Sequence, residues 1–125
     1  MSVQIAVDVT SGVPVYEQLR AQVVAHVAAG RLAPGDRLPT IRALATDLGV
    51  APGTVQRAFR ELELTGVVVT RRRSGTVVAA GAAPAHGTAR HDAARDAAAT
   101  YVRAARAAGL TPQEALDLVR GALLT

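Results

Sequence analysis

The stretch from Leu38 to Gly66 constrains the fold more than any other part of the chain. It contains two short segments in which apolar residues recur at helical spacing, one on each side of a turn at residues 48–51. These residues are Ile41, Leu44, Ala45 and Leu48 in the first segment, and Val55, Ala58, Phe59 and Leu62 in the second. Two short amphipathic helices around a tight turn predict a helix-turn-helix, whose second helix reads a DNA groove.

The second helix has a polar side opposite its apolar side. A helical wheel places Gly53, Gln56, Arg57 and Arg60 there. An arginine can donate two parallel hydrogen bonds to a guanine edge, a glutamine can pair with adenine, and a glycine lets the backbone approach closely. The same side is equally compatible with an ordinary solvated helix surface, so nucleic-acid binding needs support from the sequence that follows.

A β-hairpin with a basic tip is expected directly after this helix. Gly66 ends the helix, and residues 67–70 and 76–78 read as two strands. The turn between them consists of Arg71, Arg72, Arg73, Ser74 and Gly75. Three adjacent arginines cannot be buried without unpaired charges, so they project into solvent or onto an anion. A turn that merely promotes solubility explains one arginine better than three. The hairpin therefore resembles a wing whose tip contacts DNA phosphates or a minor groove.

The basic residues are concentrated in this region. The chain has 14 Arg and no Lys against 10 acidic residues, a formal net charge of +4. Seven of the arginines, and only three acidic residues, lie between Arg37 and Gly75. A local excess of this kind favours a polyanion such as DNA.

At this point the sequence resembles the GntR family of bacterial transcription regulators, and its short length resembles the YtrA-type subfamily. The matching residues are Pro14–Leu19, Gly30–Pro39, Gly49–Val50, Thr54–Leu62 and Gly75–Val77. The resemblance implies a sequence-specific, DNA-binding transcription regulator that acts as a repressor. It also implies that Arg37 and Arg42 contact the DNA backbone, although an ion pair with Asp36 is a rival role for Arg37.

The sequence departs from the family at the start of the second helix. Family members often have Ser, Thr or Asn there, whereas Ala51, Pro52 and Gly53 provide no hydrogen-bonding side chain. Thr54 is then the only hydroxyl at the helix start. This departure keeps an alternative open: an architectural or adaptor protein that binds DNA without sequence-specific regulation.

The N-terminal part of the chain is expected to contain a strand, a helix and a loop. Val3–Val9 alternates apolar and polar residues, which predicts a short half-buried strand paired within the chain or with another subunit. Pro14 begins a helix that ends at Gly30. Residues 31–39 form an ordered loop, and Thr40 caps the next helix. Within the first helix, His26 and Tyr16 are interpreted as packing residues.

The C-terminal part is predicted to be a helical hairpin. A linker at residues 80–89 precedes a helix from residue 90 to 108, and a capping box at residues 111–114 begins a second helix. The apolar stripe of this hairpin cannot be buried internally, so we expect it to form a dimer rather than fold back on its own winged domain. The expected dimerisation residues are Ala94, Ala98, Tyr101, Ala105, Leu116, Val119 and Leu123.

The fold class predicted from the sequence is therefore mainly α with a small β-hairpin. A winged helix-turn-helix domain (residues 1–79) is followed by the linker (80–89) and a two-helix dimerisation tail (90–125). We expect a homodimer that binds double-stranded operator DNA. The expected DNA-binding residues are Arg37, Thr40, Arg42, Gly53, Thr54, Gln56, Arg57, Arg60, Arg71, Arg72, Arg73, Ser74 and Gly75.

Other function classes receive little support from the sequence. No nucleophile stands beside a base and no glycine-rich phosphate loop follows a strand, so an enzyme is not expected. We expect no cofactor and no metal, because His86 and His91 lie in a glycine-containing segment typical of solvated residues. The absence of cysteine, of a signal peptide and of a run of about 18 apolar residues predicts a cytoplasmic protein without a membrane segment. A small-molecule effector, if one exists, would bind at the dimer interface or between tail and winged domain.

Overall fold

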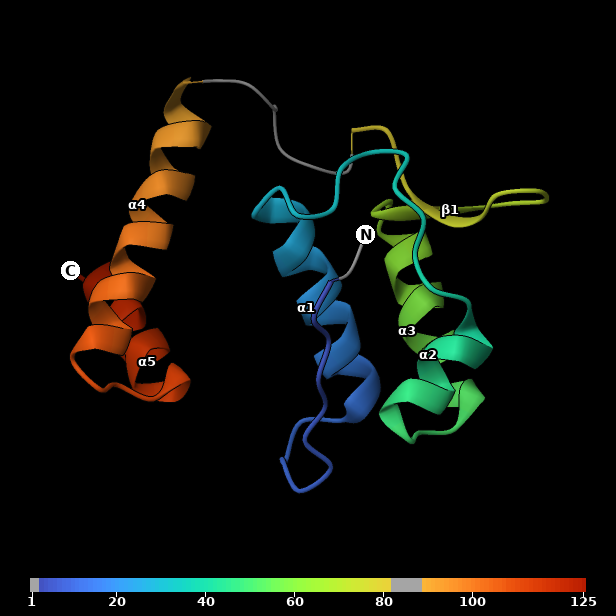
Figure 1. The fold of residues 1–125 in the computed structure, drawn as a ribbon, viewed down its shortest axis with the longest axis horizontal. Helices are drawn as coiled ribbons and strands as arrows, with labels where there is room; N and C mark the ends of the chain where they lie inside the picture. The colour runs from blue at the N-terminus through green and yellow to red at the C-terminus, as the bar shows by residue number, and fades with distance from the viewer. Residues whose placement is uncertain (1–2, 82–88) are drawn as a thin grey trace. The chain divides into compact units, whose positions relative to one another are not determined.

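The computed structural model of the protein describes residues 3–81 and 89–125 (Figure 1), with the side chains of residues 89–91 left out. The elements in chain order are α1 (Val15–Ala28), α2 (Ile41–Leu48), α3 (Pro52–Leu64), β1 (Val68–Arg71), β2 (Gly75–Val78), α4 (Ala89–Ala107) and α5 (Pro112–Leu123). The chain divides into two compact units, Met1–Pro84 and Ala85–Thr125. Among the described helices, none has the length and apolar character needed to cross a membrane. The fold is the mainly α winged helix-turn-helix followed by a helical hairpin that the sequence predicts.

The first unit has one hydrophobic core, where α1, α2 and α3 meet the base of the β-hairpin. The buried residues are Leu19, Val23, Val27, Leu32, Leu38, Leu44, Ala45, Val55, Ala58, Phe59, Leu62, Val68 and Val78. All eight apolar residues that define the helix-turn-helix pattern are buried in this core or packed against it. Burial of that stripe fixes the angular position of α3 and leaves its polar side outside.

The two helices of the helix-turn-helix begin in different ways. The Thr40 hydroxyl accepts a hydrogen bond from the Ala43 N–H at 3.1 Å, so Thr40 caps α2 as predicted. Gly49 ends α2 in the left-handed conformation with φ of +69°, which glycine adopts without a steric penalty. Ala51 stands at the cap position of α3 and makes no side-chain hydrogen bond, while Pro52 occupies the first turn.

The wing is a two-stranded antiparallel hairpin with a shorter turn than predicted. Arg71 pairs with Gly75 as the last pair of the ladder, so residues 72–74 alone form the tip. Gly75 has φ of +71°, a conformation that side chains other than glycine rarely adopt. The strands thus include Arg71 and Gly75, which the sequence pattern assigned to the turn.

The loop before α2 pairs with the outer edge of β2. The Leu38 N–H donates to the Thr76 carbonyl at 2.8 Å, and the Val78 N–H donates to the Asp36 carbonyl at 2.8 Å. Arg37 lies between these bonds, opposite Val77. The Asp36 carboxylate accepts from the Ala33 N–H at 2.8 Å, and an ion pair with Arg37 is not among those of the described residues.

The N-terminal segment is extended and pairs with no strand of the described chain, so the predicted pairing within the chain is wrong, while pairing with another subunit stays a prediction. Residues 3–8 run beside α1 (Figure 1), and their backbone bonds to side chains of α1 instead of to another strand. The expected alternation is nevertheless present, since Val3, Ile5 and Val7 are half-buried and pack against the core. Alternating apolar residues indicate that one side of an extended chain is covered, and in this structure α1 covers that side.

Three side chains of α1 form the ladder that holds this segment. Gln18 and Gln22 each exchange two hydrogen bonds with the backbone of the segment, at Asp8 and at Ala6. The third, His26, is 9% exposed and contacts the Gln4 carbonyl at 2.8 Å through Nε2. Four helical residues rise about 6 Å and two extended residues advance about 6.6 Å, which allows the three side chains to match alternate backbone positions.

The second unit is the hairpin of α4 and α5. Thr111 and Glu114 form the predicted capping box, because the Thr111 hydroxyl accepts from the Glu114 N–H at 3.1 Å and the Glu114 carboxylate accepts from the Thr111 N–H at 3.0 Å. The pKa of the Glu114 carboxyl is lowered, first by the hydrogen bond from the Thr111 backbone and then by hydrogen bonding with the Thr111 side chain. The Tyr101 hydroxyl donates to the Ala115 carbonyl at 2.7 Å, and this bond joins the two helices.

Candidate nucleic-acid interface

A concave surface brings together three segments that are separate in the sequence. This arginine cleft has a volume of about 500 Å³ and is formed by the loop before α2, the first turn of α2 and the wing. It is lined by Arg37, Leu38, Thr40, Ile41, Arg42, Arg73, Ser74, Gly75 and Thr76. Three arginines and no acidic residue line the cleft, so it is suited to a phosphate group.

The pairing of the loop with β2 explains why these arginines meet. Arg37 is held opposite Val77. Arg42 is the second residue of α2, which begins directly after this loop. Arg73 lines the cleft from the tip of the wing, and this tip leads directly into β2, the strand with which the loop pairs. All three side chains are exposed, and none takes part in the salt bridges of the described residues. Their positive charge is therefore available to a ligand.

The polar side of α3 lies outside the core, as the helical wheel predicts. Gly53, Gln56, Arg57 and Arg60 are exposed, and Thr54 is half-buried. On the opposite side, Val55, Ala58 and Leu62 are fully buried.

Gly53 is not required by the packing of the protein itself. A Cβ atom built at this position meets no atom within 4 Å, and its backbone φ is not positive. Glycine in a helix is less stable than alanine. Glycine at this position leaves the backbone of α3 open to close approach by a ligand.

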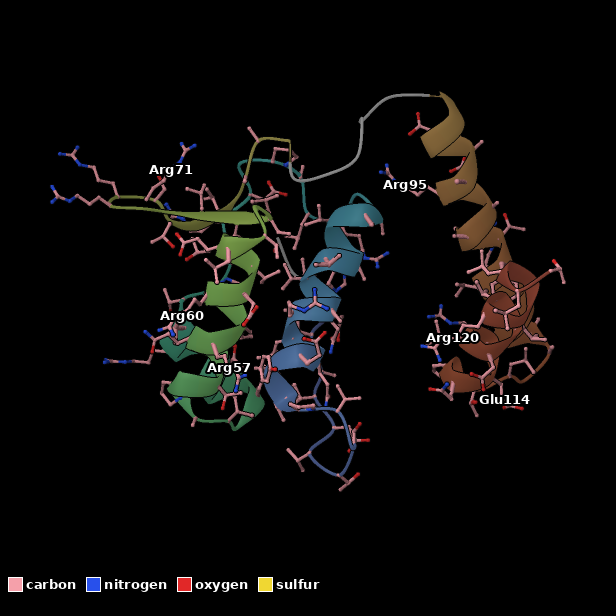
Figure 2. The ribbon with its side chains drawn as sticks, turned by 180° about the vertical axis from the view of Figure 1, so that it is seen from behind. Arg57, Arg60, Arg71, Arg95, Glu114 and Arg120 are labelled. Atoms are coloured by element: carbon pink, nitrogen blue, oxygen red, sulfur yellow. The ribbon has the colours of Figure 1, made fainter. Side chains whose placement is uncertain are left out.

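The two arginines of α3 differ in their surroundings. The guanidinium carbon of Arg57 lies 3.8 Å from the centre of the Tyr16 ring on α1. Figure 2 shows Arg57 on the side of α3 next to α1, whereas Arg60 points away from α1. No hydrogen bond, ion pair or ring contact of Arg60 is found among the described residues. The polar side of α3 therefore combines one arginine that stacks on a ring with one that has no such contact among the described residues.

The wing carries its arginines into solvent. Arg71, Arg72 and Arg73 are exposed, and Ser74 is half-buried at the tip. Figure 2 shows the wing extending away from the helices, with Arg71 along it. The arginines of the wing and those of α3 belong to the same compact unit, so their spacing is set by its core.

Sequence reasoning missed one residue that supports this surface and three that hold the N-terminal segment on α1. Tyr16 was interpreted as a packing residue, yet its ring supports Arg57. His26 is indeed packed, but it also accepts a hydrogen bond from Arg31 Nε at 2.8 Å through Nδ1, so its Nε2 donates to the Gln4 carbonyl. A signal for the ladder was present in the polar i, i+4 spacing of Gln18, Gln22 and His26. No comparable signal linked Tyr16 to Arg57, since they lie 41 positions apart.

The hairpin of the second unit exposes a broad apolar surface on α5. Leu116, Val119 and Leu123 are 52%, 41% and 77% exposed, and α5 buries no residue completely. A groove of about 530 Å³ between α4 and α5 is lined mainly by apolar side chains.

The other expected dimerisation residues lie on α4. Ala94 and Ala98 are exposed. Tyr101 and Ala105 also serve the hairpin internally, because Tyr101 bonds to α5 and Ala105 is only 5% exposed. Of the two histidines considered as metal ligands, His86 and the side chain of His91 lie outside the described residues.

Comparison with known proteins identifies the family. The model of the gntR family of bacterial regulatory proteins matches residues 15–78. The transcriptional regulator Rv1152 of Mycobacterium tuberculosis is 50% identical over 111 residues, covering 88% of this chain and 86% of that protein. The transcriptional repressor YtrA of Bacillus subtilis is 40% identical over 74 residues, covering 59% of this chain and 57% of YtrA.

Solved structures give the same result. YtrA of Sulfolobus acidocaldarius, a GntR-family transcription factor, has a TM-score of 0.57 and 39% identity, covering 61% of this chain and 80% of that one. The DNA-binding domain of AraR in complex with operator ORE1 has a TM-score of 0.51 and 25% identity, covering 62% of this chain and 94% of that one. The match to the family model, over residues 15–78, spans α1, both helices of the helix-turn-helix and the wing. The chain therefore belongs to the GntR family of bacterial regulatory proteins and is a DNA-binding transcriptional regulator.

Proposed function

We propose that the protein is a homodimeric transcriptional repressor that reads a palindromic operator with α3 and grips the flanking backbone with the arginine cleft and the wing. The observation that carries the proposal is the meeting of Arg37, Arg42 and Arg73 around one cleft beside an exposed, polar α3. Phosphate contacts set the position of a protein on DNA, and contacts to base edges supply sequence preference. The unit offers both kinds of contact on one surface.

The residues divide between these two tasks. Arg37, Arg42 and the arginines of the wing contact phosphates, because they surround a concave surface or project from a tip. Thr54, Gln56, Arg57 and Arg60 face the major groove from α3, where amide and guanidinium groups pair with purine edges. Thr40, Ser74 and Gly75 line the rim and allow the backbone to approach. The AraR structure, which contains an operator, supports DNA as the ligand of this surface.

Dimerisation through the hairpin brings two such surfaces together. Leu116, Val119 and Leu123 are large apolar side chains in an α5 that buries nothing completely within its own unit. Complete burial of a fully exposed large apolar side chain contributes about 1.5–3 kcal/mol, and these three still expose 41–77% of their surface, so a second copy that covers them would be stabilised by part of that amount. Two-fold symmetry then repeats α3 at half-sites about one helical turn apart.

Repression follows when the occupied operator overlaps a promoter. The relative YtrA of Bacillus subtilis is named a repressor, which supports this direction of control. A small-molecule effector would bind at the dimer interface, where the groove between α4 and α5 is lined by several of the expected dimerisation residues and has a volume of about 530 Å³, within the usual range for ligand sites. It would act on the spacing of the two α3 helices through the linker at residues 80–89. Lengthening that linker should change the preferred half-site separation; an unchanged separation and affinity would exclude this route.

In vitro selection from a random-sequence duplex library tests the proposal. The full-length protein is expected to enrich a two-fold symmetric sequence, and the same sequence placed over a reporter promoter is expected to lower transcription when the protein is present. Enrichment of no sequence, with uniform binding to all duplexes, would support an architectural or adaptor protein instead. The uncapped start of α3 at Ala51 is the feature that favours this second candidate.

A further inference from the structure

We propose that Tyr16 is a positioning residue that orients Arg57 for base reading. The inference rests on the proposed function, because it assigns a role within the same DNA-binding surface. Its starting point is the 3.8 Å separation between the Arg57 guanidinium carbon and the centre of the Tyr16 ring. That distance corresponds to a guanidinium group lying over the face of the ring, where the ring quadrupole attracts the cation.

Stacking changes what Arg57 can offer to DNA. A free arginine side chain loses much rotamer freedom when it forms a bidentate contact, whereas a stacked guanidinium has already lost part of it. The ring covers one face of the group, whereas the N–H bonds lie in the plane of the guanidinium and are not consumed by stacking. Tyr16 thus orders the donors of Arg57 without using them.

The ring itself is held firmly with respect to α3. Tyr16 is half-buried and packs against the core. Leu19 and Val23 of α1 are buried in the same core as Val55 and Phe59 of α3. This shared core fixes α1 beside α3, where Tyr16 meets Arg57.

Arg60 provides an internal comparison on the same helix. It is exposed three residues away and has no ring contact among the described residues. The sequence preference contributed by Arg57 should therefore depend on Tyr16, and the contribution of Arg60 should not. A role of Tyr16 in packing alone would weaken both contributions together.

The experiment combines in vitro selection with a double-mutant cycle. The most enriched duplex for the wild-type protein is titrated, beside a random-sequence duplex, with Tyr16→Leu, Tyr16→Phe, Arg57→Ala, Arg60→Ala and the doubles of Tyr16→Leu with each arginine variant. Tyr16→Phe keeps the ring and should bind as the wild type does. Tyr16→Leu should weaken the enriched duplex by about two- to fivefold, the range of an exposed cation–π contact, with little change for the random duplex. Urea unfolding of each variant establishes that it is folded.

The pattern of additivity decides the question. In the Arg57→Ala background Tyr16→Leu should have no further effect, whereas in the Arg60→Ala background it should keep its full effect. Repeated selection with Tyr16→Leu should lose preference at the same base positions as Arg57→Ala. An unchanged preference, or equal effects in both backgrounds, would overturn the role of Tyr16 while leaving the regulator intact. If the wild-type protein enriches no sequence, the proposed function fails, and the role of Tyr16 fails with it.

Discussion

The Leu38 N–H donates a hydrogen bond to the Thr76 carbonyl at 2.8 Å, and this bond joins the start of the helix-turn-helix to the wing. Two parts of the proposed DNA-binding surface that are nearly 40 residues apart in the sequence are thereby held at a fixed spacing. The loop acts as a short third strand on β2, which places Arg37 and Arg42 beside Arg73. The phosphate contacts of α2 and of the wing are therefore expected to act as one unit.

Replacing Gly53 with alanine should have opposite effects on stability and on DNA binding. Because a Cβ here meets no atom within 4 Å, the Gly53→Ala variant should be more stable, by about 0.5–1 kcal/mol. Its affinity for the selected duplex should fall, since the added methyl group stands where the backbone approaches DNA. Gly121→Ala is the matched control, because Gly121 also lies in a helix with open space around its Cβ position. Urea unfolding and duplex titration measure both effects; unchanged affinity in Gly53→Ala would mean that DNA does not approach closely there.

The hydrogen-bonding ladder beside α1 predicts a stabilising role for Gln22. Its amide exchanges two hydrogen bonds with Ala6, so Gln22→Ala should lower the free energy of unfolding by about 1–3 kcal/mol. Amide hydrogen exchange should become faster at Ala6. Gln113→Ala removes only an exposed side-chain contact to Asp117 and should cost at most about 0.5 kcal/mol. Equal losses in the two variants would contradict the ladder.

An arginine on the apolar side of α5 should prevent dimerisation. Leu116→Arg places a charge within the surface that we expect the second copy to cover, and a buried unpaired charge is strongly unfavourable. Sedimentation should show a monomer for this variant. Gln113→Arg, which adds the same charge three residues earlier beside Asp117, should remain dimeric. A dimer that persists in Leu116→Arg would place the interface elsewhere.

Acid should weaken the start of α5 through Glu114. Its pKa lies below the usual value of 4.5 because the carboxylate accepts the Thr111 N–H. A lowered pKa in the folded state means that the stabilisation is fully present above pH 4.5 and is lost as the pH falls through the lower folded value. Glu114→Gln keeps a hydrogen-bond acceptor without a titrating group, so its stability should change less over that range. Far-UV circular dichroism during urea unfolding at several pH values measures the difference; parallel profiles for the two proteins would contradict it.

Local patterns in the sequence were sufficient for the helices, the presence of the wing and the capping box. The apolar spacing around Val55 and Leu62 reports burial on one side of a helix, and Thr111 with Glu114 is a local signature. The N-terminal segment could not be assigned correctly, because alternation in Val3–Val9 does not reveal whether a strand or a helix covers it. Contacts between distant residues were equally hidden.

The candidate site shows the same limit. The arginines of the wing and of α3 were recognised individually, since a charge cluster and a helical wheel are local features. The grouping of Arg37, Arg42 and Arg73 around one cleft depends on the pairing of residues 35–38 with β2, which no short-range pattern encodes. The support of Arg57 by Tyr16 depends on how α1 packs against α3. Such relationships follow from the tertiary fold alone.

The salt dependence of duplex binding tests the central claim most directly. The affinity of the wild-type protein and of Arg37→Ala, Arg42→Ala and Arg73→Ala is measured by fluorescence anisotropy over a series of salt concentrations, with the selected duplex and a random one. The wild-type protein should bind with a steep slope, and each replacement should weaken both duplexes alike and reduce the slope by about one. No saturable binding by the wild-type protein even at about 50 mM salt, or variants with the wild-type slope, would contradict the assignment of this cleft to DNA phosphates.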